Sequence, residues 1–256
     1  MSMLKCVKYE VRKILNNPWF YIGVLVAIVL LGISTFTVAY AKNHPDVIPD
    51  GTVQDLTVSG FHSLQDALNT GSFSLILAVV ISVYVCSTFS QGLLKNELVC
   101  GFSRQKLFLG KYVATLIVSD IAALVVMLGS FIIGSVLGGV GEAGTSRLVL
   151  NLVAQIVLMN GYASIFFFVA SLVKKTLPAV LVNLFLPTVI GTILSYSELL
   201  FHSKVHLYRV WLDVLAADLF HVTTEHLNYA FYFIVAIVYC VVFAAASAVS
   251  VKKVEV

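Results

Sequence analysis

Six long apolar runs constrain this chain more than any other feature of its sequence. They occupy residues 18–41, 72–90, 112–137, 148–173, 176–196 and 229–251. A transmembrane helix needs roughly 20 consecutive apolar residues. Charged residues make up only 11% of the chain and the mean hydropathy is +0.97, whereas about 25% of the residues in a soluble domain are charged. We therefore predict an all-α membrane protein with six transmembrane helices.

The distribution of Lys and Arg predicts the orientation of the chain. Twelve of the sixteen basic residues fall in the connections on the same side as the N-terminus, and four fall on the opposite side. Because basic residues are enriched in short cytoplasmic connections, we expect both termini to be cytoplasmic. The net charge of +3 is small and no basic stripe is interleaved with aromatic residues. We therefore expect no nucleic-acid partner.

Residues 1–17 form an amphipathic unit ahead of the first span. Apolar residues at helical spacing define one stripe, which consists of Met3, Leu4, Val7, Val11, Ile14 and Leu15. Basic residues occupy other faces of the same helix: Lys5, Lys8, Arg12 and Lys13. This pattern favours an interfacial helix in contact with lipid headgroups over an ordinary basic flank. Asn17-Pro18 ends that helix, and residues 18–256 then form one six-helix transmembrane domain.

Two connections on the outer side are long. Residues 42–71 are polar and acidic, and their second half has room for a short helix. Residues 197–228 mix large apolar side chains with charged residues and four histidines. This segment is too polar to span a membrane and too apolar to lie free in water. We predict two short amphipathic helices at the outer interface before the sixth span.

Polar residues inside the spans mark candidates for a translocation path. Asp120 is the only charged residue in the six runs. An intramembrane carboxylate is costly and is a functional candidate by default; the alternative is that it lies near the inner interface and bonds nearby polar groups. Asn151, Gln155 and Asn160 form one stripe on the fourth run, for which interhelical hydrogen bonding is the preferred interpretation. Pro187 predicts a kink in the fifth run.

The third run also carries a row of small residues. Ser130, Gly134 and Gly138 follow one another at intervals of four. Small side chains at this spacing let another backbone approach closely. We therefore predict a close-packing face there.

The sequence contains no catalytic or nucleotide-binding motif. Gly110-Lys111 is followed by Tyr112 and lacks the glycine spacing of a phosphate-binding loop. The longest piece outside the spans, residues 197–228, is too short for a soluble catalytic domain. His202 and His206 have a spacing that can bind a metal ion, but no cysteine completes a ligand set, so polar surface residues are the preferred interpretation. We expect no enzymatic activity, cofactor or metal ion in this chain alone.

A compact polar segment separates the second and third runs. Residues 89–111 read FSQGLLKNELVCGFSRQKLFLGK. Gly101 can end one helix in a left-handed conformation, and Ser103 can cap the next. The segment therefore predicts a cytoplasmic helical hairpin. An ordinary solvated loop is the alternative, and the apolar residues near the tip argue against it.

The pattern F-S-x-G-x-x-K-N-x-L-x-x-G-x-S-R-x(6)-K resembles the hairpin between the second and third spans of type-2 ABC transporter permeases. The most similar members are the small six-span permeases of bacteriocin-immunity and bacitracin-resistance exporters. The layout agrees along the whole chain, from the interfacial helix to the outer segment before the sixth span. The resemblance implies a multi-pass protein of the bacterial plasma membrane.

In that family the hairpin couples the permease to a separate ATPase subunit. The resemblance assigns this role to Gly92, Leu94, Lys95, Asn96, Glu97, Leu98, Gly101, Phe102, Ser103, Arg104, Lys106 and Lys111. Val99 joins the apolar residues as a buried anchor. It also implies a second permease subunit, identical or homologous, and ATP with magnesium on the partner ATPase.

Two functions follow as hypotheses. The first is the permease subunit of an ATP-driven exporter of an amphipathic substrate, such as a peptide, a lipid-like molecule or a drug. The second is a sensor or interaction protein of the membrane that binds a ligand through its outer helices and transports nothing. Co-purification with an ATPase distinguishes them.

Overall fold

The computed structural model describes residues 3–44, 58–68, 71–90, 104–142, 148–201, 207–220 and 228–252. Every secondary-structure element in these ranges is helical. Six of the described helices are long and apolar enough to cross a membrane: α2 (Pro18–Asn43), α4 (Ser72–Ser90), α6 (Arg104–Gly138), α7 (Leu148–Val173), α8 (Thr176–Phe201) and α10 (Tyr229–Lys252). They coincide with the six apolar runs. The prediction of an all-α, multi-pass membrane protein is confirmed.

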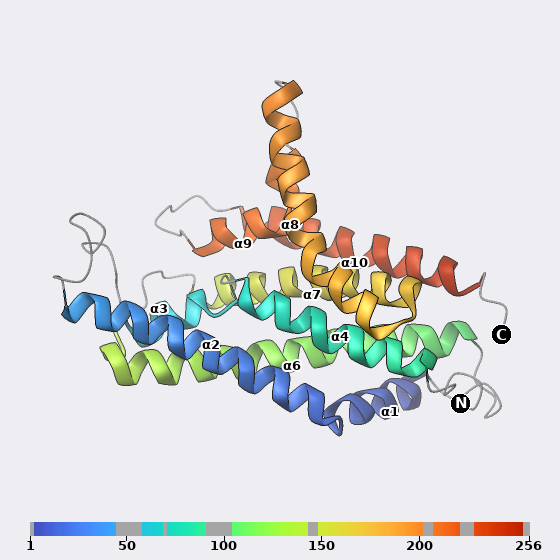
Figure 1. Ribbon diagram of the computed structural model, residues 1–256, viewed down its shortest axis with the longest axis horizontal. Helices are drawn as coiled ribbons and strands as arrows, with labels where there is room; N and C mark the ends of the chain where they lie inside the picture. Colours follow the sequence, from blue (N-terminus) through green and yellow to red (C-terminus); the bar gives the residue numbers. More distant parts are fainter. Residues whose placement is uncertain are drawn as a thin grey trace.

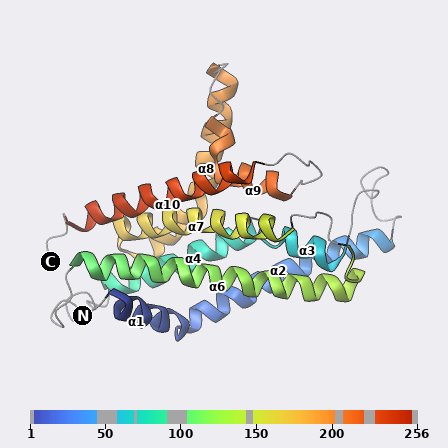
Figure 2. The ribbon, with the colours of Figure 1, turned by 180° about the vertical axis from the view of Figure 1, so that it is seen from behind.

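The spans α2, α4, α6, α7 and α10 run roughly along the long axis of the molecule, and α8 rises across that axis (Figures 1 and 2). The short helix α1 (Met3–Leu15) packs on α6 near its start, and α3 (Gly60–Asp66) packs on α6 near its end. These two contacts define an α1 end and an α3 end of the bundle. The C-terminal part of α8 bends away from the other spans in both views. Pro187 lies inside this helix, where it removes a backbone hydrogen bond.

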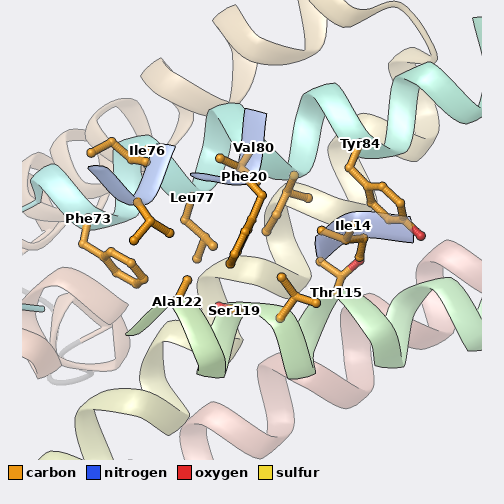
Figure 3. A pocket seen from close by; sticks show the side chains of 13 residues that line it. Ile14, Phe20, Phe73, Ile76, Leu77, Val80, Tyr84, Thr115, Ser119 and Ala122 are labelled. Carbon is orange, nitrogen blue, oxygen red and sulfur yellow. The ribbon is translucent and has the colours of Figure 1, made fainter. Parts of the chain in front are cut away.

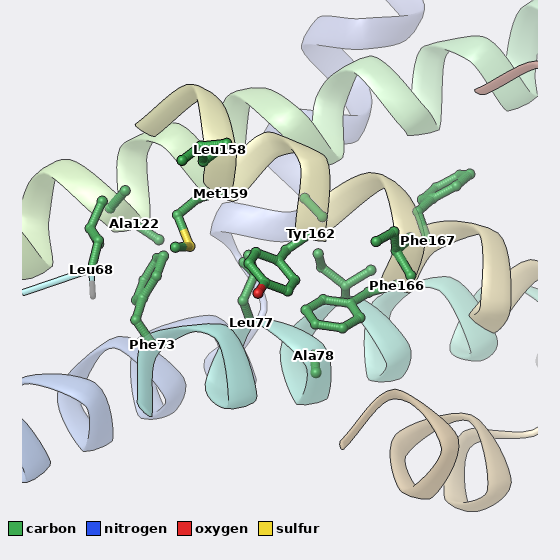
Figure 4. Close-up of a cluster of buried hydrophobic side chains, with 14 of the residues drawn as sticks. Leu68, Phe73, Leu77, Ala78, Ala122, Leu158, Met159, Tyr162, Phe166 and Phe167 are labelled. Carbon is green, nitrogen blue, oxygen red and sulfur yellow. The ribbon is translucent and has the colours of Figure 1, made fainter. Parts of the chain in front are cut away.

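Helix α7 is the centre of the bundle. Residues 161–167 of this helix are all buried in succession, which means that neighbours cover its whole circumference there. Tyr162 and Phe166 point toward Leu77 and Ala78 of α4 in this core (Figure 4), whereas Phe167 packs against Phe108 and Tyr112 of α6. A helix that is apolar on every side is typical of a protein core or a membrane span, and this stretch of α7 is covered by other helices.

The small-residue face of α6 packs against α3 and the residues before it. A Cβ atom at Gly138 would overlap the carbonyl oxygen of Val58, and one at Gly134 would overlap the Ser63 side chain. The backbone N–H of Gly60 also donates to the carbonyl of Gly139 at 2.9 Å. The predicted close-packing face is confirmed, and its partner is the short helix α3 with the residues before it instead of another span.

The predicted N-terminal helix forms, and much of its predicted stripe packs against the protein, since Ile14 is buried and Val7, Val11 and Leu15 contact the core. Cys6, Glu10 and Ile14 are the buried residues of α1, whereas Leu4 is 81% exposed. The carboxylate of Glu10 therefore lies in the middle of the buried face of α1. Residues that are far away in the sequence compensate its charge. Asn17 accepts a hydrogen bond from the backbone N–H of Trp19 and starts α2, as expected for an Asn-Pro boundary.

The outer segment before the sixth span departs from the prediction of two amphipathic helices. Residues up to Phe201 continue α8, and the described remainder consists of a 3-10 turn, η2 (Leu207–Val210), and one α-helix, α9 (Leu212–Phe220). Leu212, Leu215 and Leu219 are buried in the protein core. Packing against α7 therefore accounts for the apolar stripe of α9.

Candidate functional site

A buried ion pair joins α1 to α6 at the α1 end of the bundle. Lys111 Nζ donates to Glu10 Oε1 at 2.7 Å, and Tyr84 Oη of α4 donates to Glu10 Oε2 at 2.6 Å. Glu10 is 0% exposed and the Lys111 side chain is 8% exposed. We call these three residues the Glu10 cluster. A buried charge is tolerated when it is paired and hydrogen-bonded, and both carboxylate oxygens of Glu10 meet that condition.

The Glu10 cluster joins the two helices that flank residues 91–103. Tyr84 lies six residues before the end of α4, and Lys111 lies seven residues after the start of α6. At a rise of 1.5 Å per residue these positions are about 9 and 10 Å from the respective helix ends. The Glu10 carboxylate of α1 therefore bonds to the last part of α4 and to the first part of α6, the two helices that flank residues 91–103.

Close packing reinforces this junction. A Cβ atom at Gly110 would lie 2.7 Å from Cys6 Sγ, so the absence of a side chain lets α1 approach α6 closely. A cavity of about 30 Å³ lies beside it, between α1, α2, α4 and α6. Ile14 and Tyr84 lie at one end of this cavity and Phe73 at the other (Figure 3). Ile14 and Tyr84 are themselves buried in the hydrophobic core, so apolar contacts and the ion pair together dock α1.

Most of the predicted coupling residues lie outside the described part of the chain. These are Gly92, Leu94, Lys95, Asn96, Glu97, Leu98, Gly101, Phe102 and Ser103. Helix α6 begins at Arg104 and continues without a break into the third span. The predicted cap residue, Ser103, directly precedes this start in the sequence. Lys106 is exposed, whereas Lys111 is buried and bonded within the chain. The Lys111 ammonium is therefore a structural partner of Glu10.

Asp120 is hydrogen-bonded across the interface between α6 and α7. Asn160 Nδ2 donates to Asp120 Oδ1 at 2.8 Å, and both side chains are half-buried. The structure thus brings together two of the residues predicted for a translocation path. Lys111 is the basic residue of α6 that is nearest to Asp120 in the sequence. It bonds to Glu10, whereas Asp120 bonds to the Asn160 amide.

The hydrogen bonds continue from Asn160 toward the α1 end. Ser164 Oγ donates to the Asn160 carbonyl at 2.7 Å and lies 2.7 Å from Tyr112 Oη. Tyr112 Oη also donates to the Cys240 carbonyl of α10 at 2.9 Å. These residues form a polar track between α6, α7 and α10, with Asp120 as its only ionisable carboxylate. The track can stabilise a carboxylate inside the bundle, but it contains no nucleophile paired with a base.

Asn151 and Gln155 have a different role from Asp120. Asn151 Nδ2 donates to the Leu219 carbonyl of α9 at 2.7 Å, and Gln155 Nε2 donates to the Gln65 carbonyl of α3 at 3.0 Å. Gln155 Nε2 also donates to Asn151 Oδ1 at 3.0 Å. The pair therefore attaches the two outer helices to α7. The interpretation as interhelical hydrogen bonding is confirmed for these two residues.

Pro187 is buried in α8, one turn after Asn183. Asn183 Nδ2 donates to Ser82 Oγ at 2.8 Å and to the Phe166 carbonyl at 3.1 Å. These bonds attach the first half of α8 to α4 and α7. Beyond Pro187, the helix meets Trp211 at Gly191.

Two polar groups of the site were not identified from the sequence. Glu10 stood among basic residues and was not assigned to the buried face, although its spacing of four from Cys6 and Ile14 was a usable signal. Asp213 of α9 accepts hydrogen bonds from Tyr162 Oη and, at 2.8 Å, from Trp211 Nε1. The position of Asp213 beside Trp211 and among the leucines of α9 was the signal that could have identified it.

Nothing in the described residues provides a metal centre. No group of three His, Cys, Asp or Glu side chains in that part of the chain is arranged to hold a metal ion. His202 and His206 lie outside the described residues.

Comparison with known proteins places the chain in a family without assigning a function. No curated protein matches the sequence. The model of one protein family, described as a protein of unknown function (DUF2705), matches residues 20–256. That match includes the six spans, the polar track and two residues of the Glu10 cluster. The chain belongs to the DUF2705 family.

Proposed function

We propose that this chain is the transmembrane permease subunit of an ATP-driven exporter, in which a separate ATPase subunit supplies the energy. The Glu10 cluster is the observation that supports this most directly. It connects the N-terminal helix to both helices that flank residues 91–103, the segment with the permease-like pattern. A force applied at that segment would therefore act on three helices together.

The length of α6 supports the same function. It has 35 residues, which corresponds to roughly 52 Å at 1.5 Å per residue. It is anchored to α1 near its start and to α3 near its end. A displacement at its start can therefore reach the opposite end of the bundle through one continuous helix.

The substrate class follows from the surroundings of the polar track. Asp120 is a single carboxylate among apolar side chains of α6, α7 and α10, so an amphipathic molecule with a polar or cationic group is the best match. We propose export across the bacterial plasma membrane, by two such subunits together with two ATPase subunits.

Co-purification tests the proposal. The full chain, extracted from its native cells in a mild detergent, is expected to bring down an ABC ATPase. Replacing Glu97 and Arg104 by Ala is expected to weaken that association while the protein still inserts into the membrane. Absence of any ATPase from the wild-type preparation would contradict the proposal.

A membrane sensor is the second candidate. It is favoured by the attachment of both outer helices, α3 and α9, to the central helix α7 through Gln155 and Asn151. A ligand that displaced either helix would alter α7 directly. A sensor would purify without an ATPase, so the same experiment decides between the two functions.

A further inference from the structure

Glu10 occupies a position that a helix lying at the membrane interface does not by itself require. It is the only acidic residue of α1, it is completely buried, and its two oxygens bond to two different spans. The exposed side chains of α1 include Lys5, Lys8 and Arg12. An interfacial helix needs only basic and apolar residues to bind a membrane surface, so a buried carboxylate indicates an additional, intramolecular role.

We propose that Glu10 is a positioning residue that makes α1, the end of α4 and the start of α6 one mechanical unit. The inference deepens the proposed function and its coupling role rests on it. In the permease, movement of the two helices at the ATPase would be passed to α1, and α1 would hold both helices in the register that the ATPase recognises. Glu10 would contact neither ATP nor the transported substrate.

Three observations support this assignment. The two hydrogen bonds of Glu10 are 2.7 and 2.6 Å long and come from helices that are separate in the sequence. Gly110, next to Lys111, is in close contact with Cys6, one turn before Glu10 on the same face of α1. Ile14, one turn after Glu10 on the same face of α1, is buried in the same core cluster as Tyr84.

Hydrogen exchange of the full chain in lipid nanodiscs tests the mechanical unit without any ATPase. The variant Glu10→Gln keeps the shape of the side chain and removes its charge. We expect amide exchange in α1 to become on the order of ten-fold faster or more, with α10 unchanged. Lys8→Gln removes a charge from the exposed face of the same helix and is the matched control, which should exchange like the wild type.

A charge-reversal variant distinguishes loss of the ion pair from general misfolding. The double variant Glu10→Lys with Lys111→Glu restores an ion pair at the same place, and it should return α1 exchange to near the wild-type rate. If α1 is equally protected in Glu10→Gln and in the wild type, the mechanical unit is disproved. Faster exchange that the charge reversal fails to rescue would also overturn the assignment to the ion pair.

The coupling role is measured on the complex with the co-purified ATPase. Glu10→Gln is expected to lower the ATPase rate of the complex by about ten-fold while Lys8→Gln leaves it unchanged, and the charge reversal should recover it. An unchanged rate in Glu10→Gln would overturn the coupling role even if exchange in α1 increased. If the wild-type chain binds no ATPase, the proposed function fails and the coupling role with it, while the exchange experiment still decides whether Glu10 holds the three helices together.

Discussion

Asn160 Nδ2 donates a hydrogen bond to Asp120 Oδ1 at 2.8 Å across the interface of the third and fourth spans. An amide donor of this kind compensates part of the cost of placing a carboxylate inside a membrane protein. It does not neutralise the charge, because an amide carries none. Asp120 is therefore held in position by Asn160, and the proposed function assigns its second oxygen to a cationic group of the substrate.

The first prediction concerns the charge of Asp120. Asp120→Asn keeps the size of the side chain and its ability to hydrogen-bond with Asn160, but it cannot ionise. We expect this variant to assemble with the ATPase and to lose substrate-stimulated ATP hydrolysis. Thr192→Val, on an exposed face of α8, is a suitable control and should behave like the wild type. Full transport by Asp120→Asn at several pH values would remove Asp120 from the translocation path.

The second prediction concerns the stability of the Glu10 cluster. Glu10→Ala removes the carboxylate partner of the buried Lys111, and breaking a buried pair in this way costs about 3–5 kcal/mol. Replacing both residues by apolar ones, as in Glu10→Leu with Lys111→Met, should be much less harmful because no charge stays buried. Thermal unfolding in detergent measures both effects, with Lys8→Ala as the control. Equal midpoints for Glu10→Ala and Lys8→Ala would show that the pair contributes little.

The comparison of sequence and structure shows which features local patterns can predict. The six spans follow from the length of the apolar runs, and the pairing of Asn151 with Gln155 follows from their spacing on one helix. The partners of Glu10 cannot be obtained in this way, because Tyr84 and Lys111 are 74 and 101 residues away from it. The periodicity of apolar residues also passes over a charged residue on a buried face, so the predicted stripe of α1 did not include Glu10.

The outer helix α9 illustrates the same limit. Its leucines predicted an amphipathic helix correctly, but amphipathicity does not say whether lipid or protein covers the apolar face. The close contact of Leu212 with Gly161 shows that α7 covers it. Only the three-dimensional arrangement of the spans contains that information.

The third prediction uses the close approach of α6 to the residues before α3. A methyl group at Gly138 would overlap the backbone carbonyl of Val58, which cannot rotate away. Gly138→Ala is therefore expected to lower the free energy of unfolding by about 1–3 kcal/mol. Gly129 of the same helix is the matched control, since a methyl group there would meet only the side chain of Ile28 at 3.2 Å. Circular dichroism during heating compares the two variants, and a Gly138→Ala protein as stable as Gly129→Ala would contradict the packing of this face.

The last prediction concerns orientation, on which the proposed coupling depends. Basic residues concentrate on the side of the N-terminus, so residues 91–103 are expected to face the cytoplasm, where an ATPase can reach them. In a chain whose four native cysteines are replaced, Asp50→Cys should react with a membrane-impermeant maleimide added to intact cells, and Asn96→Cys should not. Asn96→Cys should become reactive once the cells are permeabilised, which shows that the position is accessible from the other side. If Asn96→Cys reacts in intact cells and Asp50→Cys does not, the chain has the opposite orientation. Arg104, Lys106 and the Glu10 cluster would then lie on the outer side, where no ATP-hydrolysing subunit is present to act on them.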